Sequence, residues 1–386
     1  MATQTLGIIL HGATGRICST QHLQHALAPI IAEGGLPVGD NMVMPRLLLI
    51  GRNEERLAEI ARAHNVENWT TDLDAALADP DYPVFFEAAA THQRLATLGK
   101  AIAAGKHIYT EKPVAPTAAE GLTLLDDVET AGLKHGAVED KLFIPGFQKL
   151  NSLIQSGALG RIISFKIEFG WWVFDGKQVT TQRPSWNYQK SGGGGLLSDM
   201  HPHWRYLIEN YLGPIRTIAS TAWTAQPERI DENGDAYTVD VEDSATTLLE
   251  MESGVFGTIL SSWATRVRRD DMVTFHVDGA EGSAVAGLRR CWVQSAADTP
   301  MIRGFELGGE ANEGKDGTAY LDDWQEVTEE IPYQNGYRVG WEGFIRHIVA
   351  GEPFASDLRA GIRDVQFAEA SNQAAAERIW VPLPQL

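Results

Sequence analysis

Cysteine is scarce in this 386-residue sequence, which contains only Cys18 and Cys291. One widely separated pair does not make the disulfide framework of a small secreted domain, and no CxxC spacing is present to bind zinc. Long apolar runs are missing as well. The run Leu6–Leu10 is too short for a signal peptide, and no later run approaches the roughly 20 residues of a membrane-spanning helix. We therefore expect a reduced, soluble, cytoplasmic protein without a membrane partner.

Positive charge is also in short supply. The 32 lysines and arginines face 51 aspartates and glutamates, which gives a net charge of −19. Such a surface repels phosphate backbones, so we expect no nucleic-acid partner, although a local basic pocket could still hold a phosphate. A hydrophobic content of 44% with 22% charged residues is that of a globular protein. The length exceeds one ordinary hydrophobic core, which predicts two domains.

The first part of the chain, residues 1–143, alternates short apolar runs with helical stretches. Unbroken apolar runs are typical of buried parallel strands, and helices between them indicate crossover connections. We therefore predict an α/β, doubly wound Rossmann domain. Its expected strands are Leu6–Leu10, Leu47–Ile50, Val84–Ala89, Lys106–Thr110 and His135–Glu139, and its expected helices are Arg16–Glu33, Asn53–His64, Leu73–Ala78, Arg94–Ala104 and Thr117–Ala131. The stretch Pro29–Pro45 has three prolines and three glycines, which predicts a surface excursion.

The rest of the chain, residues 144–386, has strands that follow one another directly. Short turns such as Glu252-Ser253-Gly254 favour antiparallel pairing. We predict an α+β domain with an open, mostly antiparallel sheet, in which the C-terminal helices are included. The expected elements are strands Ile162–Trp172, Ile215–Ala222, Ala245–Glu252, Val255–Trp263 and Met272–Asp278, and a helix over Asp357–Arg378.

A glycine-rich turn follows the first predicted strand. A strand that enters such a turn and opens a helix places backbone N–H groups and the positive helix end against a pyrophosphate. The expected cofactor contacts are Gly12, Ala13, Thr14, Gly15, Arg16 and Ile17. The pattern is incomplete, because Leu10 stands at the first glycine of GxGxxG, and a tight structural turn would explain the same residues.

The second predicted strand ends without the acidic residue that would bind the adenosine ribose of NAD. Arg52 stands there instead, and its guanidinium matches a 2′-phosphate. The sequence therefore predicts NAD(P) with a mild preference for NADP. An ordinary exposed arginine at the start of a helix is the alternative interpretation.

Three segments, in order along the chain, carry a family resemblance. They are Ala104-Gly105-Lys106-His107 with Thr110-Glu111-Lys112-Pro113, then Ser156-Gly157-Ala158-Leu159-Gly160-Arg161-Ile162, and Gly193-Gly194-Gly195-Leu196-Leu197-Ser198-Asp199-Met200-His201-Pro202-His203. Together they resemble the signatures of the glucose–fructose oxidoreductase, inositol dehydrogenase and MocA family, abbreviated Gfo/Idh/MocA. The resemblance covers nearly the whole chain.

The resemblance implies an NAD(P)-dependent oxidoreductase that acts on CH–OH groups of a sugar, glycoside or polyol. It also implies a homodimer or homotetramer formed through the C-terminal sheet. Lys112, Asp199 and His203 correspond to the family's usual catalytic residues. Ala90, Thr91 and His92 match its cofactor-side loop, although the usual proline–asparagine pair is replaced by Ala90-Thr91, and Lys141 lies where a basic substrate contact is common.

The residues themselves agree with this chemistry. Oxidation of an alcohol needs a base close to the hydroxyl proton. Lys112 follows the carboxyl end of a parallel strand, which is the ligand edge of this fold, and Glu111 is expected to hold it. Asp199 and His203 are four residues apart and would share a helix face, with His203 as base and Asp199 as the orienting or substrate-binding carboxylate. A surface lysine, a helix-capping aspartate and a packed histidine are the alternatives.

Two details of the third segment bear on its fold. Pro202 is tolerated in a first helical turn, which predicts a helix start near Ser198 or Asp199. The glycines of Gly192–Gly195 are expected to let the backbone approach a bound ring. His201 adds a third polar group, for which we expect a substrate contact rather than a metal site. Trp172 and Trp186 are expected to stack on a sugar ring, or else to pack in the sheet.

Two other functions fit the same motifs. One is a redox-neutral glycoside-cleaving enzyme that keeps a tightly bound NAD and oxidises its substrate transiently. The other is a non-catalytic, cofactor-binding regulator. A regulator is expected to have lost the lysine or the histidine, and both Lys112 and His203 are present.

Overall fold

The computed structural model describes residues 2–173, 176, 180–299, 321 and 323–386. Within them the chain divides into two compact units. The first unit contains residues 1–143, 334–369 and 386, and the second contains residues 144–333 and 370–385. No helix in the described residues is both long and apolar enough to cross a membrane.

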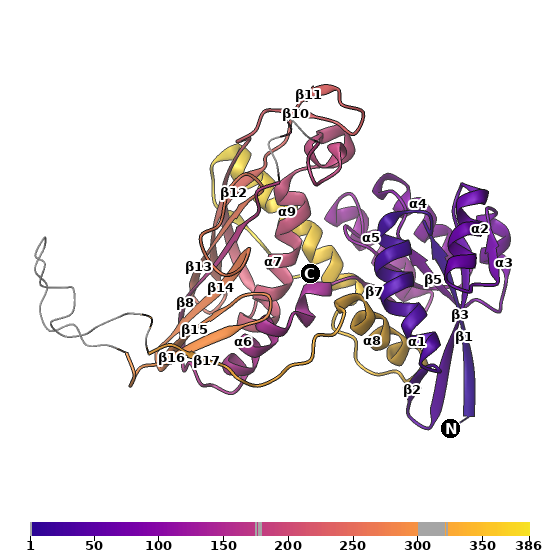
Figure 1. Ribbon diagram of the computed structural model, residues 1–386, viewed down its shortest axis with the longest axis horizontal. Coiled ribbons are helices and arrows are strands. Elements are labelled where there is room, and N and C mark those ends of the chain that lie inside the picture. The colour runs from indigo at the N-terminus through magenta and orange to yellow at the C-terminus, as the bar shows by residue number, and fades with distance from the viewer. Residues whose placement is uncertain (1, 174–175, 177–179, 300–320, 322) are drawn as a thin grey trace, which may run out of the picture. The chain divides into compact units, whose positions relative to one another are not determined.

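A seven-stranded sheet forms the centre of the first unit (Figure 1). Its strands run in the order β2-β3-β1-β5-β6-β7, with β4 paired to the end of β3. All pairs are parallel except β2 with β3. The strands are β1 (Ala2–His11), β2 (Leu36–Val38), β3 (Asn41–Ile50), β4 (Asn68–Thr70), β5 (Val84–Glu87), β6 (His107–Thr110) and β7 (His135–Ala137). This arrangement confirms the predicted Rossmann fold.

Helices cover both faces of this sheet because alternate strand residues point to opposite sides. Ile8 and Phe86 belong to one core with η1 (the π-helix Ile17–Leu27), α1 (Ala28–Ala32), α2 (Glu54–Ala63) and α8 (Gly336–Ala350). Ile9 and Phe85 belong to the other core with α3 (Leu73–Ala78), α4 (Thr91–Ala103), α5 (Ala118–Thr130) and the first part of α9 (Leu358–Glu377). Local capping sets several helix starts: the side chain of Asn53, for example, accepts the N–H of Arg56 at 2.9 Å.

Two expectations about the first unit are corrected. Residues 29–45 do not form a surface excursion: they continue through α1 into a hairpin of β2 and β3, in which Leu36, Val38 and Val43 are buried. Residues 334–369, which were expected in the second domain, cluster with the first unit. The physical reason is burial, because Trp341, Phe344 and Ile345 of α8 lie in the core of the Rossmann sheet.

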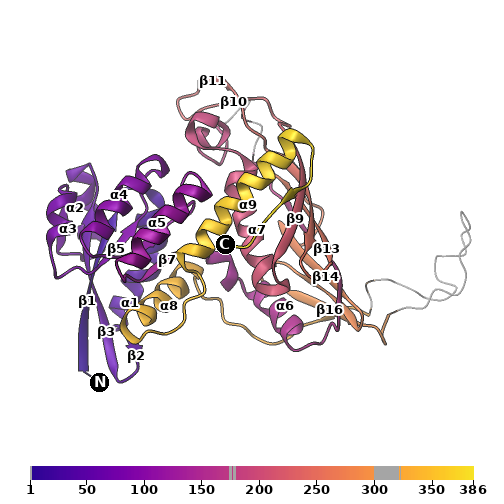
Figure 2. The same ribbon diagram turned by 180° about the vertical axis from the view of Figure 1, so that it is seen from behind.

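A nine-stranded sheet forms the second unit, in the order β17-β16-β15-β14-β8-β13-β12-β9-β18. The pair β13–β8 is parallel and the other pairs are antiparallel, which confirms the mostly antiparallel sheet. Helices α6 (Pro145–Gln155) and α7 (Leu196–Leu212) pack on one face (Figure 2). The strands are β8 (Ile162–Gly170), β9 (Ile215–Trp223), β12 (Ser244–Met251), β13 (Phe256–Ser262), β14 (Val273–Gly279), β15 (Gly282–Ala286), β16 (Cys291–Ser295), β17 (Gln325–Glu326) and β18 (Val381–Pro382), with a separate hairpin of β10 (Glu228–Ile230) and β11 (Ala236–Thr238).

Helix α7 starts earlier than Pro202 predicts. It begins at Leu196, and Pro202 lies inside the helix. The carboxylate of Glu242 accepts the N–H of Leu197 at 2.9 Å, and its backbone carbonyl accepts the N–H of Leu196 at 3.1 Å. These bonds satisfy two of the N–H groups that a helix start leaves without intrahelical partners. Glu242, which is 45 residues from Leu197 in the sequence, therefore allows the helix to begin before the predicted position.

Candidate functional site

The glycine-rich turn joins the carboxyl end of β1 to η1. Gly12 has φ of +80°, and a Cβ at this position would lie 2.7 Å from the backbone carbon of Ala88 and the backbone nitrogen of Ala89. Only glycine tolerates both constraints. The loop after β1 and the loop after β5 therefore approach each other closely at Gly12. The structure does not match the prediction that Ala13 contacts the cofactor. Ala13 is 1% exposed, and its backbone N–H donates to the backbone carbonyl of Ile50 at 2.9 Å instead of facing a ligand.

The other predicted cofactor residues follow the carboxyl ends of neighbouring strands. Arg52 comes two residues after β3 and is exposed. Ala90 caps the start of α4 after β5, with Thr91 half-buried and His92 exposed in the first turn of that helix. Because parallel strands end at a common edge, the loop after β1 lies between these two loops. The first unit thus gathers its predicted dinucleotide residues at one edge of the sheet.

Glu111 and Lys112 follow β6 at the same edge. The Glu111 side chain is buried, its Oε2 accepts the backbone N–H of Lys112 at 3.1 Å, and its Oε1 lies 2.8 Å from Nε2 of His22. Glu111 therefore does contact Lys112, through the backbone of the lysine. The Lys112 side chain is half-buried, and the Lys112–Pro113 peptide bond is cis.

Arg94 connects the two loops that carry these residues, and sequence reasoning missed it. Its guanidinium is fully buried and donates to the carbonyl of Ala89 at 3.1 Å and to the carbonyl of Pro113. Burial lowers the pKa of Arg94, and the carboxylates of Glu87 and Glu111 oppose this shift. The only sequence signal was an arginine in the first turn of a helix, where a positive side chain opposes the helix dipole.

Lys141 lies in the 3₁₀ helix η2 (Asp140–Phe143), still in the first unit. Its ammonium forms an ion pair with Asp140, and the lysine side chain is 32% exposed. Part of the charge expected to meet a substrate is therefore compensated by the neighbouring aspartate.

In the second unit, Asp199 and His203 lie on α7 at the i, i+4 spacing that places them on one helix face. The carboxylate of Asp199 forms an ion pair with Arg183, a residue that the sequence analysis did not select. The Arg183 guanidinium lies 4.5 Å from the ring centre of Trp263, which restricts its position. Nδ1 of His203 lies 2.8 Å from the hydroxyl of Tyr206.

The glycine run before α7 serves the protein's own packing. A Cβ at Gly194 would lie 2.4 Å from the carbonyl oxygen of Asn187, and one at Gly195, where φ is +121°, would lie 2.7 Å from Glu242. Gly194 and Gly195 therefore approach neighbouring backbone and a half-buried carboxylate rather than the expected ring, whereas nothing outside the chain neighbours lies within 4 Å of a Cβ at Gly193. Burial raises the pKa of Glu242, and its hydrogen bond from Leu197 opposes the shift.

Three predicted substrate contacts occupy different environments. His201 is fully buried, with Nδ1 2.9 Å from the Ser371 hydroxyl, and burial lowers its pKa to about 3. His201 therefore lies in the packed interior, which contradicts the prediction that it contacts the substrate. Trp172 has the guanidinium of Arg266 3.9 Å from its ring centre, whereas Trp186 is 51% exposed.

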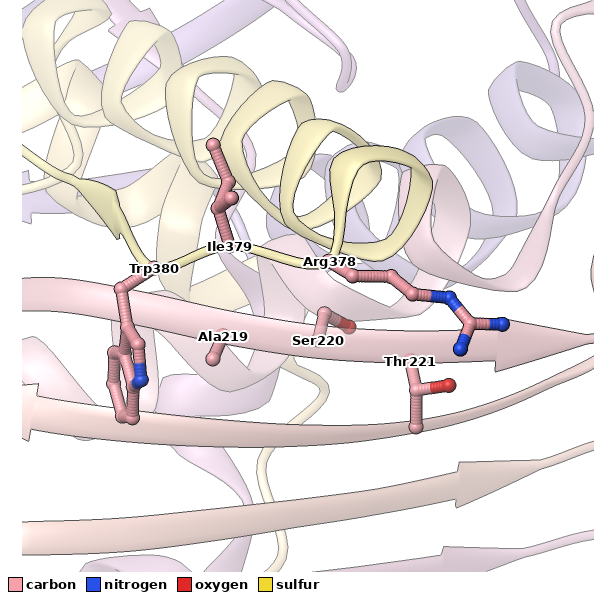
Figure 3. Close-up of a pocket in the computed structure, with 6 residues that line it drawn as sticks. All are labelled: Ala219, Ser220, Thr221, Arg378, Ile379 and Trp380. Atoms are coloured by element: carbon pink, nitrogen blue, oxygen red, sulfur yellow. The ribbon is translucent and has the colours of Figure 1, made fainter.

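One hollow of about 280 Å³ lies elsewhere on the second unit, where the chain after α9 runs beside β9 (Figure 3). It is lined by Ala219, Ser220, Thr221, Arg378, Ile379 and Trp380. None of the predicted site residues lines this hollow.

Two family models match the chain. The model described as an oxidoreductase family with an NAD-binding Rossmann fold matches residues 46–137, and the model of the GFO/IDH/MocA C-terminal domain matches residues 147–285.

Characterised relatives match over the full length. The D-xylose dehydrogenase of Paenarthrobacter nicotinovorans is 40% identical over 100% of this chain and 99% of its own. The levoglucosan dehydrogenase of Pseudarthrobacter phenanthrenivorans is 28% identical over 100% of both chains. A solved levoglucosan dehydrogenase in complex with NADH and L-sorbose superimposes with a TM-score of 0.79 and 26% identity, over 98% of this chain and 99% of the other.

Proposed function

Since this chain belongs to the Gfo/Idh/MocA family of oxidoreductases, we propose that it is an NAD(P)-dependent dehydrogenase of sugar hydroxyl groups. Membership confirms the resemblance that the motifs carried. The observation with the greatest weight is the 40% identity to a D-xylose dehydrogenase over the whole chain. A small aldose such as D-xylose is accordingly the first substrate to test, and levoglucosan is the second.

Residues of the first unit would hold the dinucleotide. The tight turn at Gly12, the loop Ala90–His92 and the segment Glu111–Lys112 fit this group, because they lie at the carboxyl edge of the sheet. The proposal extends to a mild preference for NADP, which the exposed charge of Arg52 supports. Arg52→Ala should then raise the Kd for NADPH much more than the Kd for NADH. An equal change for both would exclude this role.

The catalytic residues we propose are Lys112, Asp199 and His203. When bound, NAD supplies the hydride acceptor. His203 takes the hydroxyl proton at Nε2, which requires Nδ1–H to donate to the Tyr206 oxygen 2.8 Å away. Arg183 pairs with Asp199, whose carboxylate can also accept hydrogen bonds from substrate hydroxyls. Lys112 orients the reacting hydroxyl by donating to its oxygen. Lys141, Trp172 and Trp186 are proposed substrate contacts.

The test is NADH formation with D-xylose, levoglucosan and a panel of other sugars. Lys112→Ala and His203→Ala should each lower kcat by about 100-fold or more, because general acid–base groups contribute roughly that much. Lys100→Ala is the matched control, since Lys100 is 55% exposed and pairs with Asp74 on the surface. Unchanged kcat in both site variants would refute the mechanism. Product formation without net NADH would instead indicate the redox-neutral, glycoside-cleaving alternative.

We further propose a homodimer or homotetramer formed through the second-unit sheet. Leu248 on β12 and Phe256 and Leu260 on β13 point to the face that α7 does not cover, and their exposed fractions are 45%, 53% and 41%. Monomers rarely expose contiguous apolar surface of this kind. The double variant Leu248→Glu/Leu260→Glu should be monomeric by light scattering coupled to size exclusion, whereas Leu122→Glu on α5 should not change the mass. A wild-type monomer would refute this assembly.

The proposed location is the cytoplasm. Cys18 and Cys291 are both buried, free thiols, and burial raises the pKa of each. Buried, protonated thiols fit a reducing compartment.

A further inference from the structure

His22 is a fully buried histidine that the proposed mechanism does not use. It lies in the π-helix η1, directly after the glycine-rich turn, and is 0% exposed. Its ring packs against Phe86, with 4.2 Å between the ring centres. Both ring nitrogens have partners: Nε2 lies 2.8 Å from Oε1 of Glu111, and Nδ1 lies 3.0 Å from the indole nitrogen of Trp341.

Trp341 fixes the protonation state of His22. An indole N–H can only donate a hydrogen bond, so Nδ1 of His22 must be the acceptor and carries no proton. The proton of the neutral imidazole is then on Nε2, where it donates to the Glu111 carboxylate. His22 is therefore a neutral donor of fixed tautomer, held by a residue 319 positions away in the sequence.

The other oxygen of the same carboxylate contacts Lys112. Oε2 of Glu111 accepts the Lys112 backbone N–H at 3.1 Å, while Oε1 is held by His22. A carboxylate bound at one oxygen can rotate about its terminal torsion, which is broad and shallow for glutamate. Binding at both oxygens fixes that torsion and, with it, the start of the Lys112–Pro113 segment.

We propose that His22 is a positioning residue for Lys112, acting through Glu111, with Trp341 setting the tautomer that makes this possible. The inference rests on the proposed role of Lys112 in the reaction. Its location agrees with the general finding that π-helical turns occur frequently at functional sites.

Three variants test the proposal. His22→Phe keeps an aromatic ring and removes the donor, whereas His22→Gln keeps an N–H donor near the position of Nε2. The control is His107→Phe in the same unit, at the opposite end of β6 from Glu111, where Nδ1 of His107 accepts the Lys134 backbone N–H at 3.0 Å. All three remove a half-buried or buried imidazole, so a general loss of stability would affect all of them.

Two readouts follow from the geometry. Hydrogen exchange of the unliganded protein should show faster exchange at the Lys112 amide in His22→Phe, near wild-type exchange in His22→Gln and no change there in His107→Phe. In turnover, His22→Phe should lower kcat roughly 10- to 100-fold with little change in the KM for the sugar. The reason is that a displacement of a reacting group by up to about 1 Å can lower the rate by about this factor. His22→Gln should recover most of this loss. Unchanged Lys112 exchange and kcat in His22→Phe would overturn the proposal.

A double-mutant comparison separates this inference from the proposed function. If His22 acts through Glu111, adding His22→Phe to Glu111→Gln should lower kcat by much less than it does alone. Full additivity would overturn the positioning role even if Lys112→Ala abolishes turnover. If Lys112→Ala retains wild-type turnover, the proposed mechanism fails, and the exchange experiment still decides whether His22 controls the Glu111–Lys112 contact.

Discussion

Gly12→Ala is the substitution whose effect the structure defines most closely. Gly12 has φ of +80°, a region that costs an alanine about 1–2 kcal/mol. The new Cβ would also lie 2.7 Å from backbone atoms of Ala88 and Ala89, so the loop after β5 must move. Relaxation of either loop distorts the proposed dinucleotide cradle, and binding must restore it.

We therefore expect the Kd for NADH to rise at least 5- to 30-fold, which is the equivalent of about 1–2 kcal/mol. Titration of NADH fluorescence measures this directly. Gly99→Ala is the matched control, because apart from the local backbone of α4 nothing lies within 4 Å of its Cβ position in the middle of that helix. That change should leave the Kd unaffected and stabilise the helix by up to about 1 kcal/mol. A folded Gly12→Ala protein with wild-type affinity would refute the reasoning.

Three further changes test how buried and half-buried polar side chains contribute to the free energy of unfolding. Arg94→Met leaves the carbonyls of Ala89 and Pro113 without their charged donor, and should lower the free energy of unfolding by about 2–3 kcal/mol in urea titrations. Glu242→Ala should cost about 1 kcal/mol in the same assay because it removes a helix cap, while Glu242→Gln should cost less; equal losses would exclude capping. Burial lowers the pKa of His201 to about 3 from about 6.5 in the unfolded chain, so stability present above pH 6.5 is lost as the pH falls toward 3. His201→Asn should reduce the loss of unfolding free energy between pH 7 and pH 5; an unchanged loss would contradict the shift.

Local patterns were sufficient to predict β1, β3, β5, β6 and β7 of the Rossmann sheet, but not β2 or β4. Its strands are short buried runs such as Val84–Glu87, and its glycine turn follows β1 directly. The motif residues Glu111 and Lys112 also occupy the expected strand end. Hydrophobic period and chain order determine these features within windows of about ten residues, which a single sequence contains.

Contacts between distant segments were not predictable in the same way. Glu242 binds the first turn of α7, Arg183 pairs with Asp199, and His22 lies within hydrogen-bond distance of Glu111. No local sequence pattern predicts any of these partners. The glycine run before α7 was predicted to be a place of close approach, but the groups that approach Gly194 and Gly195 are the protein's own backbone and the Glu242 side chain. Sequence spacing shows that glycine is required without showing what comes near it.

Because residues 334–369 belong to the first unit together with residues 1–143, the order of synthesis limits when the first unit can fold. Trp341, Phe344 and Ile345 complete the hydrophobic core around β1, β3 and β5, yet a ribosome adds them only after residues 144–333, which belong to the second unit. A fragment ending at residue 143 would expose the surface that these side chains cover, and we expect it to aggregate when produced alone. The Rossmann sheet can therefore complete its core only after residue 345 has been synthesised, so the first unit is not finished before the second unit begins.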